Sequence, residues 1–202
     1  MSESVASERE ELMTASRYEA LLRPLSAFPT IIVTGPHRSG TTFATEALGH
    51  DLGYMVVREE HFGFKGFRKL LWIIFWTRVA RLRIVVQAPA VFHRVPIIAR
   101  IPATAIVVMR RPLNEIARSW THTYGEGGKL LDADENNTRE LNDLGYASGN
   151  AAEIKYDLWE RWKVRLPNTY DLEYHSLRNH SMYVSDEARR ERGASWTNRR
   201  TH

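Results

Sequence analysis

The segment TGPHRSGTTF (residues 34–43) combines glycines, an arginine and hydroxyl side chains at a spacing that suits an oxyanion. Gly35 and Gly40 have the spacing of the Walker A nucleotide-binding loop, but Thr41 stands where that loop carries its lysine. The backbone N–H groups of such a loop bind phosphate or sulfate at a helix N-terminus, whatever the side chains are. Arg38 adds a permanent charge and a fork of donors suited to a phosphate. The segment therefore predicts a phosphate- or sulfate-binding loop.

Two parts of an ATP or GTP site are missing together. In such a site the loop lysine meets the terminal phosphates, and a Walker B aspartate helps to hold Mg²⁺. The predicted strands end at Gly35, Gln87 and Arg110 rather than at an aspartate. The eight histidines form no His-Glu-x-x-His pattern, so no zinc site is predicted either. The sequence thus favours a donor whose transferred group bears less charge and requires no metal.

The run Arg-Ser-Gly-Thr-Thr resembles the 5′-phosphosulfate loop of the PAPS-dependent sulfotransferases, which commonly reads Arg/Lys-Ser-Gly-Thr-Thr. The resemblance implies that this loop binds the donor PAPS and its product PAP, without a metal. It also implies a catalytic role for Arg38. The donor-binding residues predicted in the loop are Gly35, His37, Arg38, Ser39, Gly40, Thr41 and Thr42.

A second family element holds the donor's 3′-phosphate through a strand ending in Arg-x-Pro and a serine eight residues after the arginine. The stretch VVMRRPLNEIARS is similar. Arg110 has the Arg-x-Pro spacing, with Ser119 nine residues on, whereas Arg111 has the eight-residue spacing but directly precedes the proline. We predict Arg110 and Ser119, with Arg111 as the alternative. The segment RERGASWTN is similar to a C-terminal family motif and implies Arg192 and Gly193 as further contacts.

Sulfuryl transfer requires a general base for the acceptor's proton. The stretch VREEHF resembles the Gly-Glu-Glu-Thr segment of the protein-tyrosine sulfotransferases, in which a glutamate is the base. This resemblance predicts Glu60, then its neighbour Glu59, with His61 as the next alternative. Other family members carry Lys-x-His beside the third strand, where this chain has Gln87 and Pro89. The resemblance leaves open which group replaces that lysine.

The predicted elements that position these residues alternate between strands and helices. Strands are expected at residues 30–35, 54–57, 83–89, 104–112 and 169–177, and helices at residues 8–22, 41–50, 67–81, 90–100 with a bend or break at Pro96, 113–124 and 151–166. This alternation predicts an α/β protein with a parallel sheet flanked by helices. The family resemblance implies a P-loop nucleotide-kinase-like sulfotransferase fold, with the donor at the carboxyl ends of the strands.

Length and composition limit the remaining possibilities. A chain of 202 residues with 43% hydrophobic residues predicts one domain, 1–202, with an N-terminal helical region at 1–28 and a loop or lid at 125–150. The absence of cysteine excludes disulfides and a cysteine nucleophile. The N-terminus is acidic and the longest apolar run is Leu70–Trp76, so we expect a cytoplasmic protein with no transmembrane segment. A net charge of +4 favours an anionic ligand but is too mild for nucleic acid.

The predicted function is transfer of a sulfuryl group from PAPS to a hydroxyl or amine acceptor. A small molecule, a carbohydrate and a peptide tyrosine all remain open as acceptors, as does the oligomeric state. The alternatives are a divergent P-loop kinase and a catalytically inactive nucleotide-binding module. The basic and aromatic stretch FKGFRKLLWIIFWTRVARLR (residues 64–83) is expected to pack on the sheet, with an acceptor groove or a membrane surface as alternatives.

Overall fold

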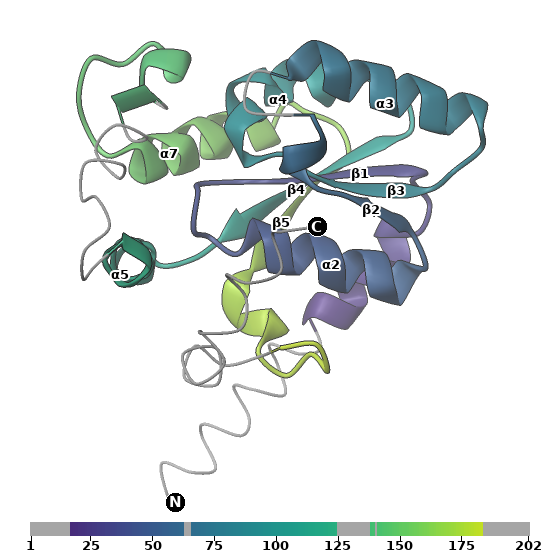
Figure 1. Cartoon of the computed structure of the whole chain (residues 1–202), viewed down its shortest axis with the longest axis horizontal. Helices are drawn as coiled ribbons and strands as arrows, with labels where there is room; N and C mark the ends of the chain where they lie inside the picture. Colours follow the sequence, from purple (N-terminus) through teal and green to yellow (C-terminus); the bar gives the residue numbers. More distant parts are fainter. Residues whose placement is uncertain (1–16, 63–65, 125–137, 140, 184–202) are drawn as a thin grey trace, which may run out of the picture.

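Five parallel strands form the central sheet of this computed structural model, which describes residues 17–62, 66–124, 138–139 and 141–183 (Figure 1). The strand order is β2-β3-β1-β4-β5. The strands are β1 Thr30–Thr34, β2 Met55–Val57, β3 Ile84–Gln87, β4 Thr104–Arg110 and β5 Thr169–Glu173. The predicted α/β class and parallel sheet are therefore confirmed.

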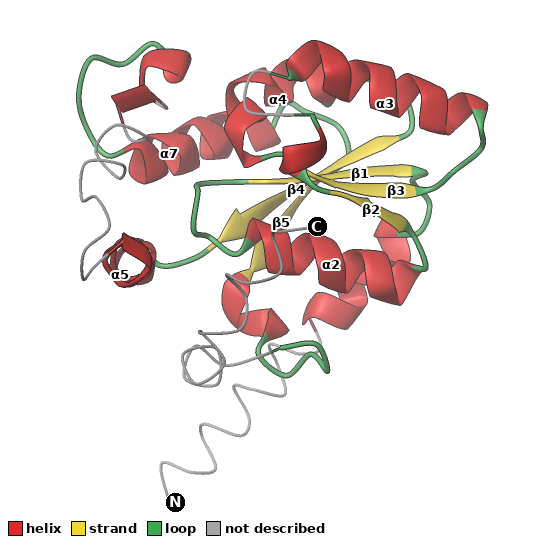
Figure 2. Cartoon of the chain, viewed as in Figure 1, coloured by secondary structure: helices red, strands yellow, loops and turns green. Residues whose placement is uncertain are grey.

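Helices cover both faces of this sheet (Figure 2). They comprise residues 17–25, α2 Thr41–Leu52, α3 Phe67–Val79, α4 Val95–Ile98, α5 Leu113–Tyr124 and α7 Ala151–Lys163, with short 3₁₀ turns η1 Glu59–His61, η2 Pro89–Arg94 and η3 Tyr174–Leu177. One hydrophobic cluster joins the sheet to residues 17–25 and α2, and the other joins it to α3, α4 and α7. The molecule thus has three layers, with a core on each side of the sheet.

Unbroken apolar runs explain why β1 and β4 lie in the middle of the sheet. Successive side chains of a strand point to opposite faces. Ile31 and Val33 accordingly contribute to the α2 cluster, while Ile32 contributes to the α3 cluster, and all three are fully buried. Strands covered on both faces carry near-continuous hydrophobic runs, as β1 does with IIV and β4 with AIVVM.

The chain diverges after β1, which pairs with β3 on one side and β4 on the other. From β1 the chain runs through α2 to β2, which lies on the far side of β3. After β3 the chain crosses to the other side of β1 and forms β4. Open α/β sheets bind ligands in the crevice outside the carboxyl ends of the strands, at such a divergence. The loop of residues 35–40 lies at this position.

Two proline positions differ from the sequence-based expectation. The first helix does not end before Pro24 but continues to residue 25, because Leu25 is fully buried in the core and the missing N–H of Pro24 leaves the carbonyl of the exposed Ala20 to water. Pro96 does not interrupt a helix either. It lies in the first turn of α4, where its missing N–H costs nothing, and the irregular backbone occurs at Val91 instead.

The predicted loop or lid at residues 125–150 falls largely outside the described residues. Within its described part, residues 141–144 are helical and Leu141 is buried. Asn150 then caps α7, because its Oδ1 accepts hydrogen bonds from the backbone N–H groups of Ala152 and Glu153 at 2.9 and 3.3 Å. This cap fixes the start of a helix that contributes to the candidate site.

Candidate functional site

The loop of residues 35–40 connects β1 to α2 at the carboxyl edge of the sheet. Its backbone has positive φ at Gly35 (139°), Arg38 (67°) and Gly40 (98°). A Cβ atom at Gly40 would lie 2.6 Å from a ring carbon of Tyr174, and one at Gly35 would lie 3.0 Å from the carbonyl oxygen of Met109. Both glycines are therefore required by the backbone and by close neighbours. Arg38 holds a left-handed conformation that costs about 1–2 kcal/mol, which is typical of residues at functional sites.

Hydroxyl side chains follow in the loop and in the first turn of α2. Ser39 is buried and its hydroxyl donates to the carbonyl oxygen of Pro36 at 2.7 Å, which closes the turn from within. Thr41 is buried, whereas the exposed Thr42 accepts a hydrogen bond from Gln87 Nε2 at 2.8 Å. Among the described residues, no side chain caps α2 and its first turn carries no acid. The positive end of the helix dipole is thus available to an anion.

Arg110, the predicted 3′-phosphate contact, points toward α7 and β5. Its Nη1 atom lies 3.2 Å from Oε1 of Glu160, and its Nε lies 4.0 Å from Oδ1 of Asp171. The guanidinium lies over the ring of Tyr156, 4.4 Å from the centroid. Arg110 is therefore held by two carboxylates and an aromatic face.

Arg111, the alternative, points toward the loop. Its Nη1 donates to the carbonyl oxygen of Arg38 at 3.2 Å, and its Nε donates to Glu115 at 3.1 Å. Its guanidinium lies over the ring of Tyr174, 4.1 Å from the centroid. Of the two arginines, Arg111 is the one that contacts the predicted donor loop. Ser119 lies half-buried on α5.

Arg192 and Gly193, predicted as further donor contacts, lie outside the described residues.

The three base candidates on η1 have different environments. Glu59 is buried, with 8% of its surface exposed, and its Oε1 accepts a hydrogen bond from the backbone N–H of Ala90 at 2.8 Å. The side chain of Glu60 is 64% exposed and lies 3.8 Å from the guanidinium of Arg58. His61 is also exposed, and its ring contacts the backbone of Arg58. Glu59 is thus the candidate directed into the protein.

A buried lysine, which the sequence analysis did not identify, contacts the residue of η2 that precedes this glutamate's partner Ala90. Lys155 on α7 is 2% exposed, and its Nζ donates to the carbonyl oxygen of Pro89 at 3.4 Å. Burial lowers the pKa of Lys155 to about 7, although the charges of Glu59 and Asp143 oppose this change. Burial likewise raises the pKa of Glu59, while the N–H of Ala90 and the charge of Lys155 act in the opposite direction. Each residue therefore stabilises the other's charged form within a dry environment.

The sequence does contain a signal for this lysine. Lys155, Trp159 and Trp162 are spaced i, i+4 and i+7, so they share one face of α7. Trp159 is fully buried, and Trp162 stacks on Phe92 with ring centroids 5.5 Å apart. A lysine within an apolar stripe is rarely buried without a partner. That position could have been identified as a functional candidate from the helical pattern alone.

The pKa of His37, in the loop, is affected by burial and by the charge of Lys155. Burial lowers the pKa of His37 to about 3, and the positive charges of Lys155, Arg38 and Arg139 lower it further. Arg139, from the segment predicted as a loop or lid, also acts on the pKa of Glu59. The imidazole is therefore neutral at neutral pH. The site combines a positively charged loop, an inward carboxylate and a buried amine at one edge of the sheet.

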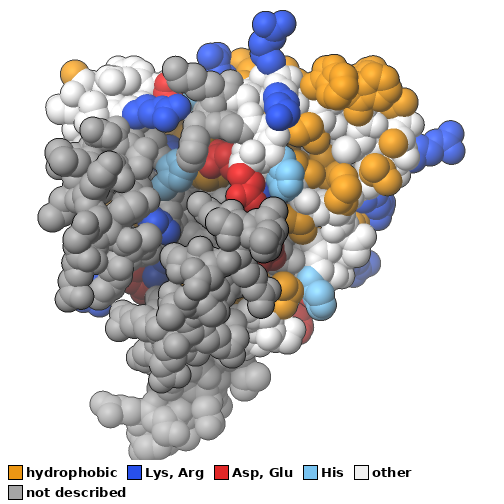
Figure 3. Space-filling model, viewed as in Figure 1, with side chains coloured by type: hydrophobic (Ala, Val, Ile, Leu, Met, Phe, Trp, Pro, Cys, Tyr) orange, Lys and Arg blue, Asp and Glu red, His pale blue; other side chains and the backbone are white. Residues whose placement is uncertain are grey.

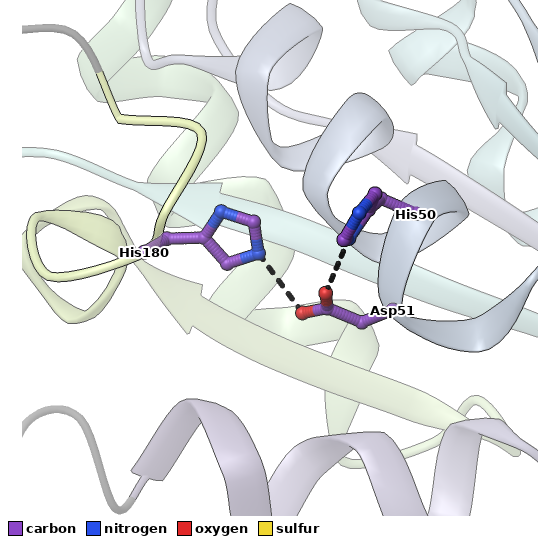
Figure 4. Close-up of side chains that lie close together, drawn as sticks. All are labelled: His50, Asp51 and His180. Carbon is purple, nitrogen blue, oxygen red and sulfur yellow. Dashed lines mark hydrogen bonds and ion pairs between the residues drawn. The ribbon is translucent and has the colours of Figure 1, made fainter.

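A separate cluster of histidines and an aspartate lies at the other end of α2 (Figure 4). The two oxygens of Asp51 accept hydrogen bonds from His50 Nδ1 at 2.8 Å and His180 Nε2 at 2.9 Å. The hydroxyl of Tyr18 also donates to Asp51, at 2.7 Å. Among the described residues, this is the one group of three side chains whose types and distances suit a metal ion. Because the carboxylate already has three donors, we interpret it as a hydrogen-bonded junction of three segments.

Comparisons with known proteins give little further information. No family model and no curated protein matches the chain. Among solved structures, shikimate kinase from Acinetobacter baumannii in complex with shikimate aligns with a TM-score of 0.42 and 12% sequence identity, covering 86% of this chain and 93% of that chain. Among the described residues, no helix has the length and hydrophobicity to span a bilayer.

Proposed function

We propose that this protein is a PAPS-dependent sulfotransferase that transfers a sulfuryl group to a hydroxyl or amine acceptor. The observation that carries the proposal is that the buried side chains of Lys155 and Glu59 contact consecutive residues of η2, Pro89 and Ala90, at the edge of the sheet that also bears the glycine loop. The loop itself lacks the Walker lysine, and β3 and β4 end in Gln87 and Arg110 rather than in an acid. This combination suits a donor handled by protein charges.

In this proposal, the donor's 5′-phosphosulfate is bound by the loop and by the first turn of α2. Backbone N–H groups, the side chain of Arg38 and the hydroxyl of Thr42 act as donors there. We assign the 3′-phosphate to Arg111 and Ser119, because Arg111 contacts the loop at the carbonyl of Arg38. Arg110 remains the alternative that the Arg-x-Pro spacing favours.

Glu59 acts as the general base in this scheme. The acceptor oxygen or nitrogen forms a bond to sulfur, the bond between sulfur and the phosphate oxygen breaks, and PAP leaves with that electron pair. The acceptor's proton passes to the carboxylate of Glu59. A pKa raised by burial brings this carboxylate closer to neutral pH, where a base is most effective.

Lys155 supplies the positive charge that other family members obtain from a lysine beside the third strand. The corresponding residue here, Gln87, is neutral and donates to Thr42. Lys155 reaches the same edge from α7, since its Nζ contacts the carbonyl of Pro89, two residues after Gln87. In its protonated form it would stabilise the negative charge that develops on the leaving group.

Ligand-induced thermal stabilisation tests the donor. We expect PAP to raise the melting temperature without added Mg²⁺, and ATP with Mg²⁺ to have little effect. A ligand at about 100 times its Kd stabilises the folded state by about 2.7 kcal/mol, which such a measurement detects. A larger shift with ATP and Mg²⁺ would overturn the proposal in favour of a kinase. Turnover of labelled PAPS with a panel of alcohols, sugars, amines and tyrosine peptides then separates an enzyme from an inactive binding module.

A further inference from the structure

The outward face of α3 is as hydrophobic as the face it buries. Trp72, Phe75, Trp76 and Val79 are between 46% and 64% exposed. Their spacing, i, i+3, i+4 and i+7, is that of a buried helix face. The opposite side of the helix already packs on the sheet (for example Ile74). A helix that is hydrophobic all round is normally covered on all sides.

These side chains form one continuous patch. The ring centroids of Trp72 and Trp76 are 5.4 Å apart, and those of Phe75 and Trp76 are 5.5 Å apart. Leu82 and Ile97 are also about half exposed. Figure 3 shows hydrophobic side chains gathered at the upper right of the view, where Figure 1 has α3, with lysine and arginine side chains around them. Exposed hydrophobic groups that are contiguous in this way mark an interaction surface.

The patch lies in a segment of the sequence that contains basic residues but no acidic ones. Residues 61–114 contain ten lysines and arginines and no aspartate or glutamate. The rest of the chain has 18 basic and 24 acidic residues, since the totals are 28 and 24, so its net charge is −6 against +10 for this segment. Exposed basic residues flank the hydrophobic stripe on both sides, with Arg68 and Lys69 before it and Arg81 and Arg83 after it. A binding partner that complements this patch therefore has a negatively charged surface with an apolar layer beneath it.

We propose that the outward face of α3 binds the surface of an anionic lipid bilayer. Aromatic side chains on such a helix insert to about the level of the headgroups, while flanking lysines and arginines contact the anionic phosphates. Tryptophan is enriched at this interface because its ring is apolar and its N–H is polar. With 13 residues, α3 is too short to span a bilayer, so it lies along the surface.

A second copy of this chain is a less suitable occupant. A symmetric dimer would place the same patch, with its basic flanks, against itself. The basic flanks of the two copies, Arg68, Lys69, Arg81 and Arg83, would then face each other, and residues 61–114 offer them no acidic partner. The charge distribution thus favours an anionic membrane over self-association.

Co-sedimentation of the full chain with vesicles tests this inference. We expect binding to vesicles of phosphatidylcholine with about 30% phosphatidylserine, much weaker binding to phosphatidylcholine alone, and loss of binding at high salt. The double substitution W72S/W76S should weaken binding by about tenfold or more, and R68E/K69E should abolish the preference for anionic vesicles. The control V164S changes an exposed residue (77%) outside α3 and should bind as the wild type does.

Unchanged binding of W72S/W76S, or no binding of the wild type to anionic vesicles, would overturn the inference. A wild-type dimer in light scattering that W72S/W76S converts to a monomer would assign the patch to a second copy instead. Circular dichroism shows whether the variants are folded. PAP should raise the melting temperature of W72S/W76S and of R68E/K69E as much as that of the wild type. The outcome is therefore independent of the proposed sulfotransferase activity.

Discussion

The amino end of α2 presents its first turn to a positively charged loop, whereas its carboxyl end is closed by hydrogen bonds. At the amino end, the described residues provide neither a capping side chain nor an acid. At the carboxyl end, the N–H of Gly53 donates to the carbonyl of His50. Asp51 there accepts hydrogen bonds from Tyr18 and from His50 and His180, the last two of which are drawn in Figure 4. One helix thus has an end suited to a ligand and an end suited to holding segments together. Substitutions near the first should change turnover and ligand binding, and those near the second should change stability.

The largest effect is expected at Glu59, on the loop side of this comparison. Glu59→Gln keeps an acceptor for the N–H of Ala90 but cannot take the acceptor's proton, so turnover should fall by about 10²–10⁴-fold while PAP binding persists. Steady-state rates with labelled PAPS measure the fall. Glu60→Gln is the matched control and should stay near wild-type activity, because its side chain is exposed. A larger loss in Glu60→Gln would return the base to the residue that the sequence favoured.

Lys155→Met should be the next most damaging substitution. It removes the buried charge, and we expect turnover to fall by about 10²–10³-fold, since a single electrostatic stabiliser contributes on that scale. Lys163→Met is the control on the same helix. It removes two ion pairs at the surface, with Glu160 and Asp171, so turnover should be unchanged. Equal losses of turnover in Lys155→Met and Lys163→Met would indicate that the substitutions disturb the packing of α7 and that the charge of Lys155 has no role in the reaction.

Lys155 also predicts a pH dependence of stability. Its pKa is about 7 in the folded protein and 10.5 in the reference state, so the unfolded chain binds more protons between these values. The free energy of unfolding should therefore rise with pH in this range, by up to about 1.4 kcal/mol per pH unit from this group. Urea titrations at pH 7 and 9 should show this rise in the wild type and its loss in Lys155→Met.

Arg110 and Arg111, at the end of β4, should differ in donor binding. Arg111→Ala should weaken PAP by about 1.5–3 kcal/mol, or about 10- to 150-fold, while an analogue without the 3′-phosphate should lose much less. Arg110→Ala should be milder, because Arg110 is paired with Glu160 and Asp171. Calorimetric titration with both ligands measures the difference. If both ligands weaken equally in Arg111→Ala, that arginine supports the loop and does not contact the phosphate.

The smallest effect, and one confined to stability, is expected at the closed end of α2. Burial opposes ionisation of Asp51, but hydrogen bonds from His50, Tyr18 and His180 outweigh it and lower the pKa of this carboxyl. The stability that ionised Asp51 contributes is therefore present above about pH 4. It is lost as the pH falls through the pKa of Asp51 in the folded protein. Asp51→Asn should cost about 1–3 kcal/mol at pH 7 in urea unfolding, and the penalty should shrink below pH 4. A change in turnover would contradict the separation of the two ends.

Much of the architecture follows from the sequence because hydrophobic runs and glycines act locally. The runs IIV and AIVVM predicted the central strands, and the glycine spacing predicted the loop after β1. The choice between the two base candidates depends on the phase of a turn. Glu59 and Glu60 are neighbours on a 3₁₀ turn, where successive side chains differ by about 120° in direction, so only the packing decides which one faces inward.

Contacts between distant segments decide which of the other candidate residues lie close to the loop. Arg110 is the last residue of β4 and Arg111 is the first residue beyond it, so the direction of each side chain depends on where the strand stops. Lys155 meets Pro89 through the packing of α7 against η2, which no local pattern specifies. The sequence could predict which residue types the site needs, but not which copies of them the fold would bring together.

The close approach of Tyr174 to Gly40 has a consequence for protein design. The ring occupies the space that a side chain at position 40 would need, and it also lies against the guanidinium of Arg111. The glycine loop is therefore not a transplantable unit of six residues. A host scaffold would also need a flat aromatic ring at the end of its outermost strand and an arginine after the neighbouring strand, in matching positions. A graft that copied the loop alone would leave a void beneath Gly40, and the backbone would lack the support that holds it at positive φ.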